Sequence, residues 1–93
     1  MSVQWLFDVI QSRRENPSEG SYTSRLLAEG LPKIAQKVGE EAVEVIIAAK
    51  GQGDQRIIEE VSDLFYHTLI LLSAKGLTLA DVEDELRKRH QKK

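Results

Sequence analysis

The sequence predicts an all-α protein of about five helices, on three observations. Charged residues make up 30% of the chain and aromatic residues only 5%, a balance that favours helix over sheet. Apolar residues recur three and four positions apart, as they do along one face of a helix. Glycines stand where these periodic stretches stop, at Gly30, Gly51 and Gly76, and glycine is the residue that most readily caps a helix end.

The first third of the chain predicts two short helices. Val3, Leu6, Phe7 and Ile10 have the spacing of a short amphipathic helix. Residues 13–21 are polar and contain proline and glycine, so we expect a loop there. A second short helix is expected over 22–29, ending at Gly30.

Two long helices follow. Pro32 suits the first turn of a helix that runs to Lys50 and stops at Gly51. Asp54 is a good N-cap for the next helix, which reaches Lys75 and closes at Gly76. The short connection between them predicts that the two helices lie antiparallel and adjacent.

A fifth helix is predicted at the C-terminus. Thr78 is its expected N-cap and Asp81 stands at its third position, while Leu77 and Val82 are spaced to form a hydrophobic staple. The basic residues over 87–93 suit the negative end of a helix dipole.

Length, charge and composition exclude several classes of protein. Ninety-three residues predict a single domain, over 1–93. A formal net charge of −2 gives no reason to expect nucleic-acid or membrane binding. With no cysteine, disulfides and thiolate metal sites are excluded. No stretch is apolar enough to span a membrane and no signal peptide is evident, so we expect a cytoplasmic protein.

Acidic residues fall at apolar positions of both long helices. On the first, Glu41 lies about 20° from Ile34 inside the apolar stripe, with Glu44 and Lys37 at its edge and Glu40 further round. On the second, Glu60, Asp63 and His67 share a sector about 60° wide. That sector is bracketed by leucine, isoleucine and alanine, whereas a solvated face would be flanked by polar residues.

Antiparallel packing would bring the two acidic sectors together. The carboxylates concerned are Glu40, Glu41, Glu44, Glu60 and Asp63. Five carboxylates in one half-buried place repel one another unless protons or a cation are present, and all-oxygen ligation favours Mg²⁺ or Mn²⁺ over Zn²⁺. The alternative is that these are surface residues paired with Lys37, Lys50 or Arg56. We favour the metal site.

Basic residues upstream are compatible with a polyphosphate ligand. They are Arg13, Arg14, Arg25, Lys33 and Lys37. Cations beside a carboxylate-held metal can share the negative charge of a polyphosphate. Taken singly, the arginines are equally well explained as solvated residues of loops and helix ends.

Several motifs resemble a known enzyme family. The run 40–44 (EEAVE) with 60–63 (EVSD) matches the EExxE…ExxD pattern of the all-α MazG-like nucleotide pyrophosphohydrolases. The longer strings SYTSRLL over 21–27, GLPKIAQKVGEEA over 30–42 and DLFYH over 63–67 resemble the phosphoribosyl-ATP pyrophosphatase family. This resemblance extends from about Leu6 to His90.

The resemblance implies Mg²⁺-dependent hydrolysis of the α–β phosphoanhydride of phosphoribosyl-ATP, the second step of histidine biosynthesis. It implies that Glu41, Glu44, Glu60 and Asp63 bind the metal, and that Glu40 supports these ligands or orients the attacking water. It further implies phosphate contacts from Arg25, Lys33 and Lys37, with Arg13 as a further candidate. Ser21, Tyr22 and Thr23 are expected near the substrate. His67 is expected to order a carboxylate, touch substrate, or form a hydrogen-bonded part of the core.

Two kinds of partner are expected. The second long helix is apolar around most of its circumference, which predicts a homodimer in which paired hairpins form a four-helix bundle. In some members of the family this enzyme is fused to phosphoribosyl-AMP cyclohydrolase. We expect the stand-alone form here, with a possible transient contact to a separate cyclohydrolase.

Three alternatives stay open at this point. The first is the same chemistry on another substrate, by a MazG-like housekeeping (d)NTP pyrophosphatase. The second is a ferritin-like di-iron protein, although Glu60 is followed three residues later by Asp63 where that class has histidine. The third is a helical interaction module without catalytic activity.

Overall fold

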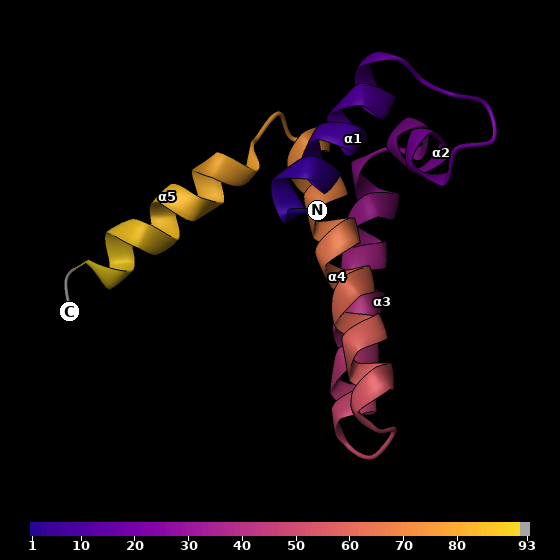
Figure 1. Cartoon of the computed structure of the whole chain (residues 1–93). Coiled ribbons are helices and arrows are strands. Elements are labelled where there is room, and N and C mark those ends of the chain that lie inside the picture. The colour runs from indigo at the N-terminus through magenta and orange to yellow at the C-terminus, as the bar shows by residue number, and fades with distance from the viewer. Residues whose placement is uncertain (92–93) are drawn as a thin grey trace.

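The computed structural model describes residues 1–91 and is all-α over that range, as predicted. Two short helices lie at one end of a long helical hairpin, and the last helix projects away from the rest of the molecule (Figure 1). The helices are α1 (Val3–Glu15), α2 (Tyr22–Glu29), α3 (Leu31–Ala49), α4 (Asp54–Ala74) and α5 (Leu79–His90). None of these helices is long and apolar enough to cross a membrane.

The hairpin of α3 and α4 is antiparallel, as predicted, and its connection depends on glycine. Gly51 and Gly53 have φ of +144° and +91°, values that residues with a Cβ rarely adopt. The prediction of Asp54 as the N-cap of α4 was wrong. Gly53 is the N-cap, and Asp54 lies in the first helical turn, where its carboxylate still interacts favourably with the helix dipole.

Helix α1 is longer than predicted. The polar loop expected from residue 13 begins only at Asn16, and residues 13–15 complete the last turn of α1. The arginines of that turn suit the negative end of the helix dipole. The helix stops there because the residue before Pro17 is sterically disfavoured in the α conformation.

The boundary between α4 and α5 follows the prediction. Gly76 has φ of +74°, and the backbone N–H groups of Gly76 and Leu77 donate to the carbonyls of Ser73 and Leu72 in a Schellman motif. Thr78 caps α5 in a complete capping box with Asp81. Helix α5 contributes no buried residue.

The core lies where α1 and α2 cover one end of the hairpin. Its buried members come from four helices and are Phe7, Ile10, Leu26, Ile34, Leu69 and Ile70. The far half of the hairpin has no such cover (Figure 1). Accordingly the radius of gyration is 14.5 Å, against roughly 12–13 Å for a compact domain of this length.

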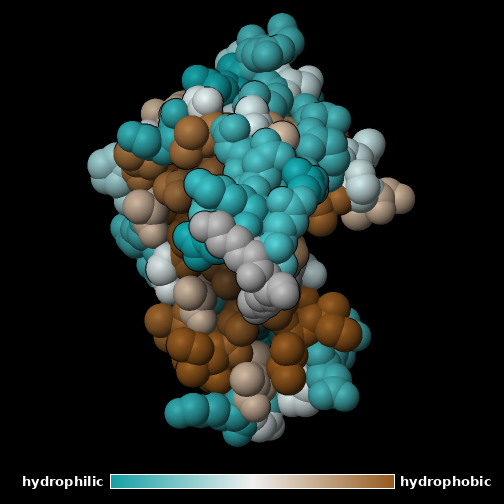
Figure 2. Space-filling model, turned by 90° about the vertical axis from the view of Figure 1, so that its left-hand side faces the viewer, coloured by the Kyte–Doolittle hydropathy of each residue, from teal (hydrophilic) through white to brown (hydrophobic). Residues whose placement is uncertain are grey.

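Helix α4 buries part of its acidic sector together with apolar residues near its C-terminal end. Glu60, His67, Leu69 and Ile70 are buried, whereas Val61 and Leu64 are half-buried. Large apolar side chains of the uncovered half are exposed, namely Val43, Ile46 and Ile47 of α3 and Ile58 of α4. Figure 2 shows hydrophobic side chains gathered on this part of the molecule.

Candidate functional site

A polar groove runs between α3 and α4 at the middle of the hairpin. Its volume is about 460 Å³. The residues that line it are Lys37, Glu40, Glu41 and Glu44 from α3 and Arg56, Glu60 and Asp63 from α4. The five carboxylates that the sequence places on facing helices therefore share one groove.

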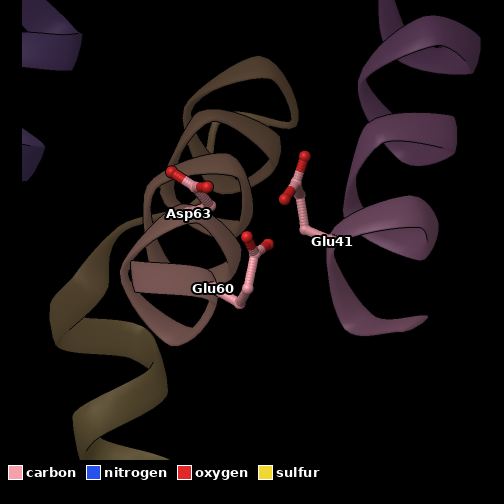
Figure 3. Close-up of side chains that lie close together, drawn as sticks. All are labelled: Glu41, Glu60 and Asp63. Atoms are coloured by element: carbon pink, nitrogen blue, oxygen red, sulfur yellow. The ribbon is translucent and has the colours of Figure 1, made fainter. Parts of the chain in front are cut away.

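Three of these carboxylates converge. One oxygen each of Glu41, Glu60 and Asp63 lie within 4.8 Å of one another, and Figure 3 shows Glu41 reaching from α3 toward the two side chains on α4. The side chains of Glu41 and Glu60 are only 13% and 5% exposed. Glu44 lines the same groove but lies outside this group of three.

The expectation that all five carboxylates are half-buried was wrong. Glu40, Glu44 and Asp63 are exposed, because the hairpin is covered by α1 and α2 only at its other end. Glu40 accepts a hydrogen bond from Gln36 at 2.9 Å. That bond, together with neighbouring Lys37, lowers the pKa of Glu40, so its carboxyl group stays ionised.

Two cations partly neutralise the groove. Lys37 Nζ lies 3.6 Å from Glu41 and 3.5 Å from Glu40. Desolvation by itself lowers the pKa of Lys37, but Tyr22, Glu41 and Glu40 outweigh it and raise that pKa. On the other helix, Arg56 forms a salt bridge with Glu60 at 2.8 Å. The groove therefore keeps three formal negative charges in excess of its cations.

This donor set fits a hard divalent cation. Carboxylate oxygens are the ligands that Mg²⁺ and Mn²⁺ prefer, and the chain has no cysteine to offer a softer metal. A nearly buried glutamate in a region of excess negative charge is costly unless a cation compensates it. The cluster of Glu41, Glu60 and Asp63 is therefore suited to hold such an ion.

The basic residues predicted to contact phosphate are dispersed. Lys37 lines the groove, whereas Arg13, Arg25 and Lys33 are not among its lining residues. Arg13 lies in the last turn of α1, and the guanidinium of Arg25 lies 5.4 Å from the centre of the Tyr22 ring. Phosphate contact by these residues stays a prediction.

A partly buried hydrogen-bonded chain connects α2 to the metal-binding candidate Asp63. His67 is 5% exposed, and its Nδ1 lies 2.7 Å from the backbone carbonyl oxygen of Asp63. A carbonyl only accepts, so Nδ1 carries a proton, and Nε2 is hydrogen-bonded to the hydroxyl of Tyr22, also at 2.7 Å. His67 is thus a hydrogen-bonded core histidine that orders the backbone at Asp63.

The other residues expected near the substrate have local partners. Ser21 is the N-cap of α2 and accepts from the backbone N–H of Ser24. Thr23 is buried and hydrogen-bonded to the hydroxyl of Tyr66. Thr23 therefore links α2 to α4, whereas Ser21 caps α2 locally. Substrate contact by either residue stays a prediction.

Replacing Tyr22 by phenylalanine should weaken the protein in a pH-dependent way. Burial, with Tyr66 and Glu41 nearby, raises the pKa of Tyr22 above its ordinary 10.0. A raised pKa means that the folded state binds the phenol proton more tightly, so this contribution is full below pH 10.0 and is lost as pH rises through the folded pKa. At neutral pH we expect Tyr22→Phe to cost about 1–2 kcal/mol by leaving His67 Nε2 without its hydrogen-bond partner.

Urea unfolding of both proteins between neutral and strongly alkaline pH checks this prediction. The difference in stability between wild type and Tyr22→Phe should shrink above pH 10.0. A constant difference across the range would show that Tyr22 acts only through packing. Tyr66 is the other of the two tyrosines in the chain and is retained in the variant, so its contribution to the pH dependence of stability is common to both proteins.

Comparison with known proteins identifies the family. The sequence profile of the phosphoribosyl-ATP pyrophosphohydrolases matches residues 3–90. The chain belongs to this family. Its membership agrees with the resemblance inferred from the motifs, and it leaves the ferritin-like and interaction-module hypotheses without support.

Individual members of the phosphoribosyl-ATP pyrophosphohydrolase family are about half identical to this chain. A phosphoribosyl-ATP pyrophosphatase of Clostridium acetobutylicum is 51% identical over 87 residues, covering 94% of this chain and 79% of the relative. One of Limosilactobacillus fermentum is 49% identical over 87 residues, covering 94% and 82%. The histidine biosynthesis bifunctional protein HisIE of Oceanobacillus iheyensis is 51% identical over 84 residues, which are 90% of this chain but 39% of that protein.

The sequence does not reveal the roles of two residues. Arg56 lines the groove, and Tyr66 holds α2 against α4 through its hydrogen bond to Thr23. The position of Arg56 four residues before Glu60 was the available signal, because residues so spaced are neighbours on a helix. Tyr66 had no comparable signal, since its partner Thr23 lies 43 residues away.

Proposed function

We propose that this chain hydrolyses the α–β phosphoanhydride of 1-(5-phosphoribosyl)-ATP to 1-(5-phosphoribosyl)-AMP and pyrophosphate, the second step of histidine biosynthesis. The observation that carries the proposal is the convergence of Glu41, Glu60 and Asp63 in a member of this family. A carboxylate-lined groove is a chemically suitable place for a polyphosphate only when cations accompany it.

The proposed cofactor is Mg²⁺, with Mn²⁺ as the alternative. Glu41, Glu60 and Asp63 would hold the ion, and Glu44, which lines the same groove, is the proposed fourth ligand. When bound, such an ion supplies neutralisation of the charge on the phosphates. It would also offset the repulsion that an acidic groove exerts on a nucleotide.

The residues of the chain contribute position and charge. The ionised carboxylate of Glu40 is exposed at the groove, where it can accept a hydrogen bond from the attacking water and orient it. Lys37, already paired with the groove carboxylates, can donate to a phosphate oxygen. Arg25, Lys33 and Arg13 are proposed to contribute further positive charge. Positioning and electrostatic stabilisation of this kind supply most of the acceleration in phosphoryl-type transfer.

Two further proposals concern the surroundings of the enzyme. A cytoplasmic location follows from the proposed metabolic role. The bifunctional relatives support a transient contact with phosphoribosyl-AMP cyclohydrolase, because a protein fused in some relatives is a reasonable partner in others. Nucleic acid and membrane are not proposed as ligands, given the slightly acidic charge balance.

An assay of pyrophosphate release from three nucleotides identifies the substrate. We expect Mg²⁺-dependent release from phosphoribosyl-ATP, none with EDTA, and little from ATP or dCTP assayed in parallel. Faster release from ATP or dCTP than from phosphoribosyl-ATP would indicate a housekeeping (d)NTP pyrophosphatase. The proposal of the metal site would then still hold. Absence of release from all three substrates would overturn the proposal.

A homodimer is the proposed assembly. In the described part of the chain, Val43, Ile46, Ile47 and Ile58 are each more than two-fifths exposed on the half of the hairpin that α1 and α2 do not cover. A second hairpin packed there would complete a four-helix bundle and bury these side chains. The carboxylate groove would then lie beside the subunit interface.

A further inference from the structure

The guanidinium of Arg56 holds two neighbouring glutamates at once. One nitrogen lies 2.8 Å from Oε1 of Glu60 and another lies 3.0 Å from Oε1 of Glu59. The side chain of Glu60 is 5% exposed, whereas that of Glu59 is 49% exposed. Arg56 therefore links a carboxylate inside the groove with one outside it.

The three converging carboxylates are compensated unequally. Within residues 1–91, Glu41 is paired with Lys37 and Glu60 with Arg56, while Asp63 has no salt bridge. The pair with Glu60 is the shorter of the two, at 2.8 Å against 3.6 Å. Because Glu60 is also the more buried glutamate, it is the one whose charge most needs a partner.

We propose that Arg56 is the resident counter-ion of the metal site: it neutralises Glu60 in the metal-free protein, and a divalent cation binds by displacing it. This inference rests on the metal site of the proposed function. Arg56 and a cation in the cluster compete for the same carboxylate, and two positive groups cannot both lie against it without repulsion. Arg56 thus sets the metal affinity as a positioning residue and is not itself a ligand.

Glu59 gives the displaced side chain a place to go. It already accepts from Arg56, so the guanidinium can keep that ion pair when it leaves Glu60. The released charge stays at the mouth of the groove, which Arg56 lines. A buried glutamate is in this way never left uncompensated, and metal binding exchanges one counter-ion for another.

The experiment compares Mg²⁺ binding to wild type and Arg56→Gln by titration calorimetry, without substrate. Removing the competitor should tighten Mg²⁺ binding by about two- to five-fold, the scale expected for loss of one partly exposed ion pair. Arg87→Gln is the matched control, because it also removes one helical arginine, paired at 2.9 Å with Asp84 on α5 and outside the groove. Its affinity should equal that of wild type.

Stability in EDTA gives the second readout. Arg56→Gln should unfold at lower urea concentration than wild type, because Glu60 loses its counter-ion, and saturating Mg²⁺ should restore most of the difference. Arg56→Lys keeps the charge and should lie near wild type in both measurements. If Arg56→Gln does not fold without metal, the wild-type protein still tests the displacement: the NMR signal of its Arg56 side-chain N–H is monitored during Mg²⁺ addition. Arg56→Lys then serves as the folded variant for comparison of Mg²⁺ affinity and stability.

Unchanged or weaker Mg²⁺ binding by Arg56→Gln would overturn the inference, as would a wild-type Arg56 N–H signal that is unaffected by Mg²⁺. Failure of the proposed function gives a different result. In that case the wild-type protein binds no Mg²⁺, or it binds Mg²⁺ with the expected effect of Arg56→Gln and yet releases no pyrophosphate.

Discussion

Replacing Glu60 by glutamine is expected to abolish Mg²⁺-dependent pyrophosphate release while leaving the helical content intact. Glu60 contributes one of the three converging oxygens and is almost fully buried. Loss of a group that merely orients a metal ligand already costs about 10–100-fold in affinity or activity, so loss of a ligand should cost at least about 100-fold. Steady-state pyrophosphate release, with circular dichroism on the same samples, measures both effects.

Glu85→Gln is the matched control for this substitution. Glu85 also pairs with an arginine on its own helix, Arg89 at 2.8 Å, but it lies on α5, is half exposed and does not line the groove. The Glu85→Gln variant should retain most of the activity. Addition of Mg²⁺ should raise the melting temperature (Tm) of wild type and Glu85→Gln but not of Glu60→Gln. Near-full activity of Glu60→Gln would refute the metal assignment.

The helices could be predicted because the residues that determine where they begin and end lie close by in the sequence. Gly30 and Gly76 and the Thr78 capping box lie where sequence reasoning placed them. The two errors, at the end of α1 and at the start of α4, also have local causes. The restriction imposed by Pro17 on Asn16 outweighed the polar composition before it, and at Gly53 a positive φ outweighed the capping preference of Asp54.

The site could be predicted only in outline. Helical angles placed Glu41, Glu60 and Asp63 on facing surfaces, and the structure brings them together. Their degree of burial depends on which part of the hairpin α1 and α2 cover, which is a tertiary property without a local signal. The pairing of Arg56 with both Glu59 and Glu60 likewise depends on the conformation of a long flexible side chain, which sequence spacing does not determine.

Replacing Ile46 and Ile58 together by glutamine is expected to dissociate the proposed homodimer. The two side chains are 56% and 58% exposed in the single chain, so their loss should cost the fold of one subunit little. A symmetric dimer would lose four such contacts of about 1 kcal/mol or more each, which weakens association by about 1,000-fold. Sedimentation equilibrium over a range of micromolar concentrations measures the change.

Leu31→Gln controls for the loss of an exposed apolar side chain, because Leu31 is 38% exposed at the first residue of α3, at the opposite end of the hairpin. It should leave the wild-type dimer unchanged. A wild-type protein that is monomeric at these concentrations would refute the dimer itself. Since Glu41, Glu60 and Asp63 belong to one chain, the dissociated variant should still show a Mg²⁺-dependent rise in Tm. Lower pyrophosphate release by that variant, with its Mg²⁺ response retained, would then be due to the lost interface, because the metal site itself would still be formed.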